Sequence, residues 1–249
     1  MIKIIDDSTV NFKMDVETEF EEHRFKTLFS KEPETISWIK ELFRPNEILF
    51  DVGANIGVYS LYAGALYKDK IKVYAFEPAY HNFQKLCQNI LINQFNEDIL
   101  PYGVALSGKT GFSIFDLVSD ISGSANHAVL ADQTPSVNGN LVLKQGVFTV
   151  TLDDLVNKFG FTCPNHFKLD VDGQEDEVIA GAREVLNNQQ LKTAMIEVTD
   201  KNSLNKKIRE IMFKAGFKTD HPINYQANHS RERRKKSGHG DIENIIFTR

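Results

Sequence analysis

The chain has 249 residues, of which 41% are apolar, so it is long enough to bury one large hydrophobic core. Its formal net charge of -5 excludes a global attraction to nucleic acid or to an anionic membrane surface. Cys87 and Cys163 stand far apart and in no C-x-x-C spacing, which excludes a disulfide framework and a cysteine zinc motif.

No run approaches the roughly 18 apolar residues of a membrane-spanning helix, and the first ten residues lack the apolar core of a signal peptide. We therefore expect a cytoplasmic protein with neither a membrane nor a nucleic-acid partner. The sequence makes no prediction about the oligomeric state.

The N-terminal part predicts a hairpin over residues 2–14 and then an acidic segment, 17–22, typical of a solvated surface helix. The alternative for that segment is a lid over a site. Apolar residues at helical spacing predict a helix over 33–43. We expect residues 1–45 to form an extension that caps the sheet, and residues 46–249 to form the main domain.

The stretch 47–62 reads as a strand, a tight turn and a helix. Residues 48–52 are nearly all apolar, Gly53 and Gly57 bracket the turn, and the following helix is apolar almost all round. Backbone N–H groups at such a turn, together with the positive end of the helix dipole, favour an anionic group. The turn is therefore a predicted site for a carboxylate or a phosphate.

The next strand, 71–76, places the carboxylate of Glu77 at a neighbouring strand tip, where it can accept hydrogen bonds from both hydroxyls of a ribose. Asn55 stands where a dinucleotide fingerprint has its second glycine, which argues against NAD. Asp51 or Glu77 alone would read as an ordinary turn residue. Together, beside a glycine turn, they favour a ligand with a ribose and an anionic tail.

Beyond an amphipathic helix over 79–93, the pattern predicts a third strand over 100–106 and a hairpin partner over 112–117. Residues 118–146 are polar and small, which favours a substrate-side loop. Within it, residues 122–124 (Ser-Gly-Ser) either present a hydroxyl to a ligand or belong to a flexible insertion.

A fourth strand, 166–171, carries Asp170 and then Asp172, and a period of two places both on one face together with Lys168. Two like charges this close raise at least one pKa, which suits a general base, and Lys168 is the compensating cation. A single helix is expected over 174–186.

A fifth strand, 193–198, carries Glu197 near its tip, and strands near 217–220 and 243–248 are expected to pair antiparallel. The basic run 231–236 between them is typical of a solvated loop. The alternative is that it attracts an acidic acceptor such as a phosphorylated or uronic sugar.

Three segments together resemble the FkbM family of class I S-adenosylmethionine-dependent methyltransferases. They are DVGANIG at 51–57 with FEP at 76–78, VTLDDL at 150–155, and FKLDVDGQEDEVIAGA at 167–182. The resemblance covers about residues 33–197. It implies an α/β, Rossmann-like fold: a mostly parallel seven-stranded sheet with helices on both faces, an extra hairpin after the third strand and an antiparallel last strand.

The resemblance also implies S-adenosylmethionine as cofactor, with S-adenosylhomocysteine as product, and it places the adenine near Val104 and Ala105. The predicted cofactor-binding residues are Asp51, Gly53, Ala54, Asn55, Gly57, Glu77, Pro78, Val104, Ala105 and Asp170.

The predicted reaction is O-methylation of a small molecule, because the resemblance implies a hydroxyl on a sugar or a natural product. Neither an Asn-Pro-Pro-Tyr motif nor a Pro-Cys nucleophile is present, which disfavours methylation of nucleic-acid bases. An alcohol must lose its proton near the transition state, and Asp172, Asp170 or Glu197 can accept it. Asp172 ranks first because it lies furthest along the strand tip.

Two other functions stay open: a nucleotide-dependent oxidoreductase on a Rossmann fold, and a non-catalytic S-adenosylmethionine-binding protein. Asp170 and Asp172 could ligate a hard cation, but no third ligand stands at a diagnostic spacing, so no metal is predicted.

Overall fold

The computed structural model describes residues 1–125, 128–129, 141–199, 203–224 and 242–249. The basic run 231–236 and much of the predicted 118–146 loop therefore lie outside the described residues. None of the helices in the described ranges has the length and hydrophobicity that crossing a membrane requires.

A central sheet organises the molecule, with strand order β12-β11-β10-β3-β4-β5. All neighbouring pairs run parallel except β11 and β12. Because the chain order reverses between β10 and β3, ligands of such a sheet bind beyond the carboxyl ends of these two strands. The strands are β3 (Glu47–Val52), β4 (Ile71–Phe76), β5 (Ile99–Tyr102), β10 (His166–Leu169), β11 (Thr193–Thr199) and β12 (Ile242–Thr248).

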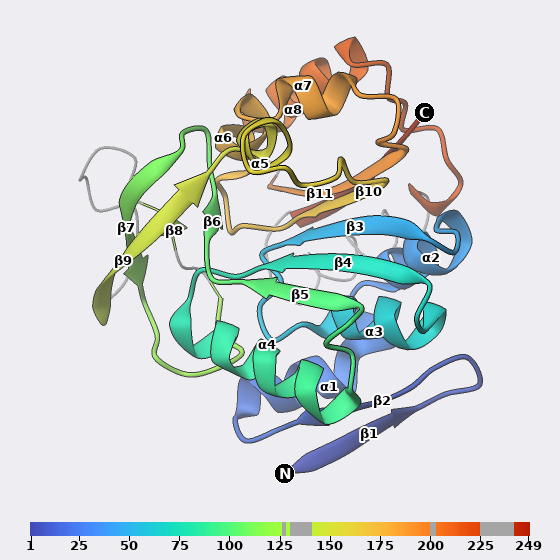
Figure 1. The fold of residues 1–249 in the computed structure, drawn as a ribbon, viewed down its shortest axis with the longest axis vertical. Helices are drawn as coiled ribbons and strands as arrows, with labels where there is room; N and C mark the ends of the chain where they lie inside the picture. Colours follow the sequence, from blue (N-terminus) through green and yellow to red (C-terminus); the bar gives the residue numbers. More distant parts are fainter. Residues whose placement is uncertain (126–127, 130–140, 200–202, 225–241) are drawn as a thin grey trace.

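Two helical layers cover the sheet, and Figure 1 shows them on its opposite faces. One layer contains α2 (Pro33–Leu42), α3 (Val58–Tyr67) and α4 (Tyr80–Asn93), and the other contains α5 (Leu152–Asn157), α6 (Glu175–Ala180), α7 (Arg183–Asn187) and α8 (Ser203–Lys214). Successive side chains of a strand point to opposite faces. Leu49 accordingly packs into the core on the α3 side and Phe50 into the core on the α8 side.

The N-terminal segment begins with a hairpin of β1 (Ile2–Asp6) and β2 (Asn11–Asp15), followed by α1 (Glu19–Lys31). Figure 1 shows this hairpin beneath α4, on the side of the helical layer that faces away from the central sheet. The expected acidic surface helix is present, with Glu17 and Glu19 exposed, but Glu21 is an exception. Glu21 is completely buried, and its carboxylate accepts the backbone N–H of Thr18 in a capping box that starts α1.

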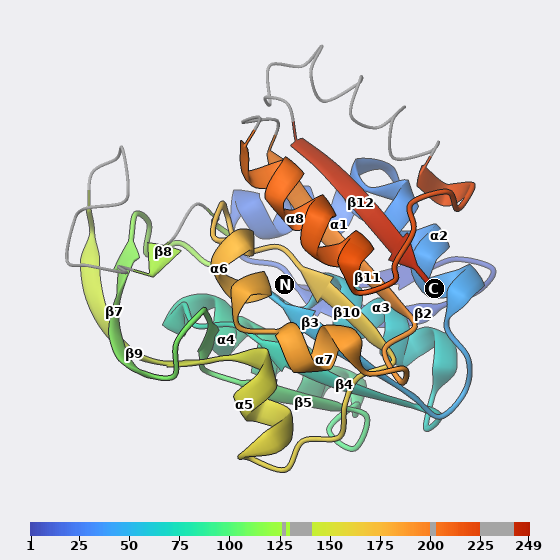
Figure 2. The same cartoon turned by 90° about the horizontal axis from the view of Figure 1, so that it is seen from above.

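A second, smaller sheet has the order β6-β9-β7-β8 and lies to one side of the central sheet (Figures 1 and 2). Its strands are β6 (Ala105–Leu106), β7 (Gly111–Leu117), β8 (Ala128–Val129) and β9 (Leu143–Val150). The predicted hairpin between 100–106 and 112–117 is wrong in its pairing. Strand β9 lies between β6 and β7, and β7 pairs with β9 along its whole length, from Gly111 opposite Thr149 to Leu117 opposite Leu143.

Three other predicted elements differ from the structure. Instead of a strand, residues 217–220 contribute an isolated bridge between Lys218 and Thr248, so the described central sheet has the six strands named above rather than seven. The predicted helix 174–186 is broken into α6 and α7 at Gly181, where a Cβ would lie 2.8 Å from the Ser107 carbonyl oxygen. Strand β10 ends at Leu169, two residues early.

Candidate active site

The β3–α3 turn is tight because it touches the tip of β10. Gly53, Asn55 and Gly57 all have positive φ values, of 78°, 53° and 88°. A Cβ on Gly53 would lie 1.7 Å from the carbonyl oxygen of Asp170, so only glycine fits there. A Cβ on Gly57 would lie 2.5 Å from Leu86 Cδ1. The glycine spacing therefore serves backbone contact with the adjacent strand and helix.

Glu77 connects this turn to the start of α4. Its Oε2 accepts the backbone N–H of Asn55 at 2.8 Å, and its Oε1 accepts that of Ala79 at 2.8 Å. A carboxylate has about four lone-pair sites, so each oxygen keeps acceptor capacity. Burial raises the pKa of Glu77 to about 7; the two N–H donors oppose that rise, whereas the negative charge of Asp172 adds to it.

A pocket lies above these strand ends and holds about 650 Å³ of space, part of it open to solvent. The structure brings eight of the predicted site residues together in its lining: Gly53, Asn55, Glu77, Pro78, Val104, Ala105, Asp170 and Asp172.

Four predicted site residues, Asp51, Ala54, Gly57 and Glu197, are not part of this lining. Asp51 is 1% exposed and its Oδ2 accepts the Ser60 hydroxyl at 2.6 Å, so its carboxylate faces helix α3. Burial raises its pKa, while the nearby Lys168 ammonium opposes the rise. The Asp51 side chain therefore contacts Ser60 of α3 and does not lie on the pocket surface.

The two aspartates beyond β10 line the pocket without the strand periodicity that was expected. Since β10 ends at Leu169 and Asp172 has a φ of 56°, a period of two no longer describes them. The compensating cation is where the sequence placed it, because Lys168 Nζ donates to Asp170 Oδ2 at 2.9 Å. Burial lowers the pKa of Lys168, but the surrounding carboxylates outweigh it and hold the pKa above its usual value.

A group of three carboxylates lies next to the pocket, formed by Glu32, Asp170 and Glu197, whose oxygens lie within 4.8 Å of one another. Two lysines balance part of this charge: Lys31 Nζ lies 3.0 Å from Glu32 Oε1, and Lys168 binds Asp170. Burial raises the pKa of Glu197 well above its usual value, and the charges of Asp170 and Glu32 raise it further.

Glu32 is a third carboxylate that sequence spacing did not identify. It precedes α2, more than a hundred residues before Asp170, and only the fold brings the two together. The geometry of the three acids would suit a cation, and lysine ammonium groups already lie against two of them.

The Ser-Gly-Ser segment 122–124 forms a wall beside the turn and contacts Asn55 and helix α4. Gly123 N donates to Asn82 Oδ1 at 2.8 Å, and Asn55 Nδ2 donates to the Ser124 carbonyl at 2.7 Å. Ser124 is 3% exposed, and its hydroxyl lies 3.4 Å from His81 Nε2. The segment therefore contributes mainly backbone contacts.

The far wall is fixed by an amide. Gln174 accepts the backbone N–H of Val129 at 2.9 Å and donates to its carbonyl at 2.6 Å, so it pairs with β8 as a neighbouring strand would. Glu175 accepts the N–H groups of Val171 and Gly173 and thereby shapes the loop after β10. These contacts account for Gln174 and Glu175 in structural terms.

Several lining residues were missed from the sequence: Arg24, Asn82, Phe115, Val129 and Gln174. Gln174 lies inside the DVDGQEDE segment and could have been found there. The others come from α1, α4, β7 and β8, and no local pattern marks them.

Comparison with known proteins gives the family. Residues 51–219 match the family model described as the methyltransferase FkbM domain. A hexuronic acid methyltransferase of Haloferax volcanii is 29% identical over 157 residues, which is 63% of this chain and 59% of that protein. The methyltransferase sdnD of Sordaria araneosa is 23% identical over 195 residues, covering 69% of this chain and 74% of that protein.

Solved structures share the fold. The methyltransferase FkbM from Methylobacillus flagellatus aligns with a TM-score of 0.54 at 16% identity, over 94% of this chain and 56% of that one. Fibrillarin of Aeropyrum pernix, crystallised with natively bound S-adenosyl-L-methionine, aligns with a TM-score of 0.52 at 9% identity, over 99% of this chain and 82% of that one. The predicted Rossmann-like class I fold is thus confirmed, and because the family match spans more than half of its length, the chain belongs to the FkbM methyltransferase family.

Proposed function

We propose that this protein binds S-adenosylmethionine and transfers its methyl group to a hydroxyl of a sugar or natural-product-like molecule. The observation that carries the proposal is Glu77, whose carboxylate is held at the pocket edge by two backbone N–H groups and keeps acceptor capacity for two ribose hydroxyls. The family match and the S-adenosylmethionine found in a structural neighbour support the choice of donor.

The donor would lie across the carboxyl ends of β3 and β4. Its ribose would bind Glu77, and its amino-acid end would lie on the Gly53–Gly57 turn. The lining near Val104 and Ala105 also includes the apolar side chains of Leu106 and Phe115, which suit an adenine ring.

Asp172 is the proposed general base, and the surroundings of the other two candidates support that order. Glu197 is outside the lining, and burial together with the charges of Asp170 and Glu32 raises its pKa well above its usual value. Asp170 already binds the ammonium of Lys168 at 2.9 Å and is better suited to positioning.

In the proposed step, the acceptor oxygen attacks the methyl carbon in line, and an O–CH₃ bond forms as the S–CH₃ bond breaks. The sulfonium becomes a neutral thioether, and the hydroxyl proton passes to Asp172. The protein acts chiefly by holding the donor carbon and acceptor oxygen in line, at about 3 to 3.5 Å. The hexuronic acid methyltransferase relative supports a saccharide acceptor, with an acidic sugar as the first to test.

Calorimetry with S-adenosylhomocysteine and with NAD tests the donor: we expect binding of the first and none of the second. Transfer of a labelled methyl group to a panel of neutral and uronic sugars and polyketide alcohols tests the reaction. We expect Asp172→Asn to bind S-adenosylhomocysteine normally and to lose at least about 100-fold in turnover, since a base typically contributes that much.

Asp176→Asn is the matched control, because Asp176 pairs with Lys207 outside the pocket and should keep full activity. Unchanged turnover in Asp172→Asn would remove the base assignment. Donor binding without methylation of any acceptor would favour the non-catalytic alternative.

A further inference from the structure

Arg24 reaches the pocket from helix α1, outside residues 51–219 that match the family model. Its side chain is half-buried, and its Nε donates to the carbonyl oxygen of Gly123 at 2.8 Å. This bond fixes the plane of the guanidinium. Neither Nη1 nor Nη2 makes a hydrogen bond or ion pair with any residue in the described ranges, so no described side chain occupies the two terminal nitrogens.

The charges of the pocket make Arg24 stand out. Among the described lining residues it is the one lysine or arginine, whereas Glu77, Asp170 and Asp172 are carboxylates. A sulfonium donor carries two cationic groups and a single carboxylate. The acids suit the cationic groups, and the planar fork of a guanidinium suits the carboxylate.

Arg24 is also placed beside the glycine turn. Three lining side chains bind the same two residues of the wall segment: Arg24 and Asn82 bind Gly123, and Asn55 binds the carbonyl of Ser124 at 2.7 Å. Asn55 belongs to the turn between β3 and α3, whose backbone N–H groups from Gly53 to Gly57 already donate to protein acceptors. The guanidinium of Arg24 is therefore the group beside this turn that can still bind an anion.

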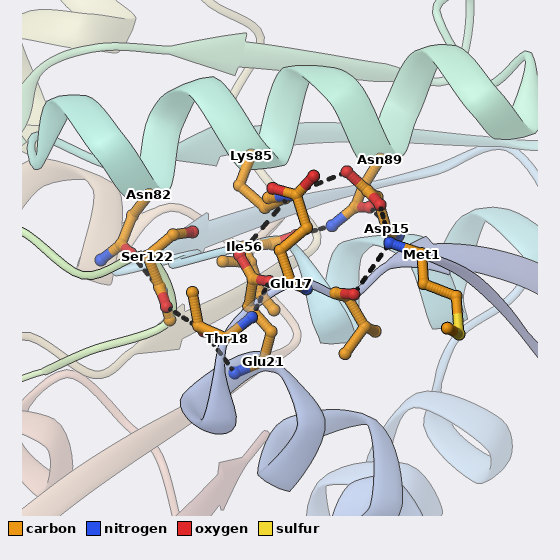
Figure 3. Close-up of polar contacts among 12 residues, drawn as sticks. Met1, Asp15, Glu17, Thr18, Glu21, Ile56, Asn82, Lys85, Asn89 and Ser122 are labelled. Atoms are coloured by element: carbon orange, nitrogen blue, oxygen red, sulfur yellow. Dashed lines mark hydrogen bonds and ion pairs between the residues drawn. The ribbon is translucent and has the colours of Figure 1, made fainter.

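Figure 3 shows how the start of α1 is held in this position. The hydroxyl of Thr18 donates to the carbonyl of Ser122 at 2.8 Å, so the helix that carries Arg24 is fixed to the wall segment at its first turn as well as at Gly123. Gly123 has a φ of 86°, and a Cβ there would lie 3.0 Å from Glu21 N, so helix and wall are in close contact.

We propose that Arg24 binds the carboxylate of the methyl donor's amino-acid end, which makes helix α1 of the N-terminal segment part of the donor site. This rests on the proposed function for the identity of the donor. The bond has a direct consequence for specificity, because it distinguishes S-adenosylmethionine from nucleosides that lack the carboxylate.

The test compares S-adenosylmethionine with its decarboxylated form, which keeps the nucleoside, the sulfonium and the amine. We expect Arg24→Met to weaken binding of S-adenosylmethionine by about 10- to 100-fold, the range for hydrogen bonds to a charged group. Binding of the decarboxylated form should be unchanged. Arg24→Lys keeps the charge but loses the fork, and it should recover part of the affinity for S-adenosylmethionine only.

Lys26→Met is the control. Lys26 lies on the same helix and its side chain is 67% exposed, so the substitution removes one positive charge from α1 without touching the pocket. It should change neither affinity. Equal losses for both ligands in Arg24→Met, or no loss for either, would overturn the assignment. A wild-type protein that binds neither ligand would instead overturn the proposed function itself. Should Arg24→Met fail to fold, the Arg24→Lys comparison decides by the same criterion.

Discussion

Glu77 lines the pocket, accepts two backbone hydrogen bonds and has a raised pKa. Its pKa, raised to about 7 by burial, lies above the value of an unfolded glutamate near 4.5. A carboxyl group whose pKa is higher in the folded state favours folding below pH 4.5, and that contribution is lost as the pH rises through 7. Ionisation of Glu77 therefore disfavours folding of the protein when no ligand is bound.

The same ionisation should favour the donor. Only the carboxylate can accept two ribose hydroxyls and two backbone N–H groups together, so S-adenosylhomocysteine affinity should rise from pH 6 to pH 8. Glu77→Gln should bind at least about 10-fold more weakly at pH 8, since a charged acceptor is lost. The S-adenosylhomocysteine affinity of Glu77→Gln should also not rise from pH 6 to pH 8.

Calorimetry in buffers with different ionisation enthalpies measures both the affinity and the proton released on binding. Glu175, whose pKa burial also raises to about 7, does not line the pocket and should release no proton. A pH-independent affinity in the wild type would contradict the role given to Glu77.

At this scale the sequence predicted the residues that follow strands and missed those that reach the pocket from elsewhere. Glu77 and Asp170 could be found because they come directly after apolar runs. Arg24 and Glu32 could not, because their neighbours give no sign that α1 and the start of α2 lie beside β10 and β11.

Among the strands, a buried polar network joins β3, β10 and β11 at the end opposite the pocket. His166 lies between Glu47 Oε2 at 2.7 Å and Thr193 Oγ1 at 2.8 Å, and its ring stacks on Phe43 at 3.7 Å. Trp38 donates its indole N–H to the same Thr193 hydroxyl at 2.8 Å. The network fixes the register of three strands whose other ends carry the site.

Glu47 should make this network sensitive to acid. Burial raises the pKa of Glu47, but hydrogen bonds from His166 and Lys192 lower it by more, so that the pKa is about 2. A carboxylate with a depressed pKa stabilises the fold above pH 4.5, and this stabilisation is lost as the pH falls toward 2. We expect Glu47→Gln to flatten the fall in the free energy of unfolding between pH 5 and pH 3.

Urea unfolding at several pH values measures this effect. The exposed Glu41 gives the matched control, because Glu41→Gln should leave the wild-type pH profile intact. If Glu47→Gln and wild type fall in parallel, the network does not carry the acid response.

Element types were predicted well, and element ends were not. The strand-turn-helix unit at β3 and α3 follows from local apolar patterning. The break between α6 and α7 depends on the Ser107 carbonyl, and the pairing of β7 depends on β9, thirty or so residues away. Periodicity contains no information about such distant partners, so it overextended the helix and mispaired the strand.

For the molecule as a whole, the N-terminal segment is fixed to α4 by a buried cation. Lys85 is 4% exposed, and its Nζ lies 2.8 Å from Asp15 Oδ2 and 2.9 Å from Glu17 Oε2 (Figure 3). Glu21 Oε1 lies 3.7 Å away. These contacts are why α1, and with it Arg24, lies beside the pocket. The division of the chain into an N-terminal extension, 1–45, and a main domain, 46–249, stays a prediction.

Lys85→Met should therefore act on both stability and donor binding. Removing one partner of a buried ion pair typically costs about 3 kcal/mol or more, because the remaining carboxylates lose their countercharge. We expect a lower free energy of unfolding, faster proteolysis within residues 1–31, and weaker S-adenosylmethionine binding. Lys40→Met, at an exposed position on α2, should show none of these changes. Normal donor affinity in a destabilised Lys85→Met would separate the N-terminal segment from the site.

The contact between Gly53 and Asp170 has one more consequence. Since the turn that would hold the donor touches the backbone that leads to Asp172, main-chain atoms rather than flexible side chains would set the spacing between the methyl group and the proposed base. A methyl group added at Gly53 would push the turn away from the backbone of Asp170 and would change this spacing. Alignment of the reactants would then depend on the absence of one carbon atom.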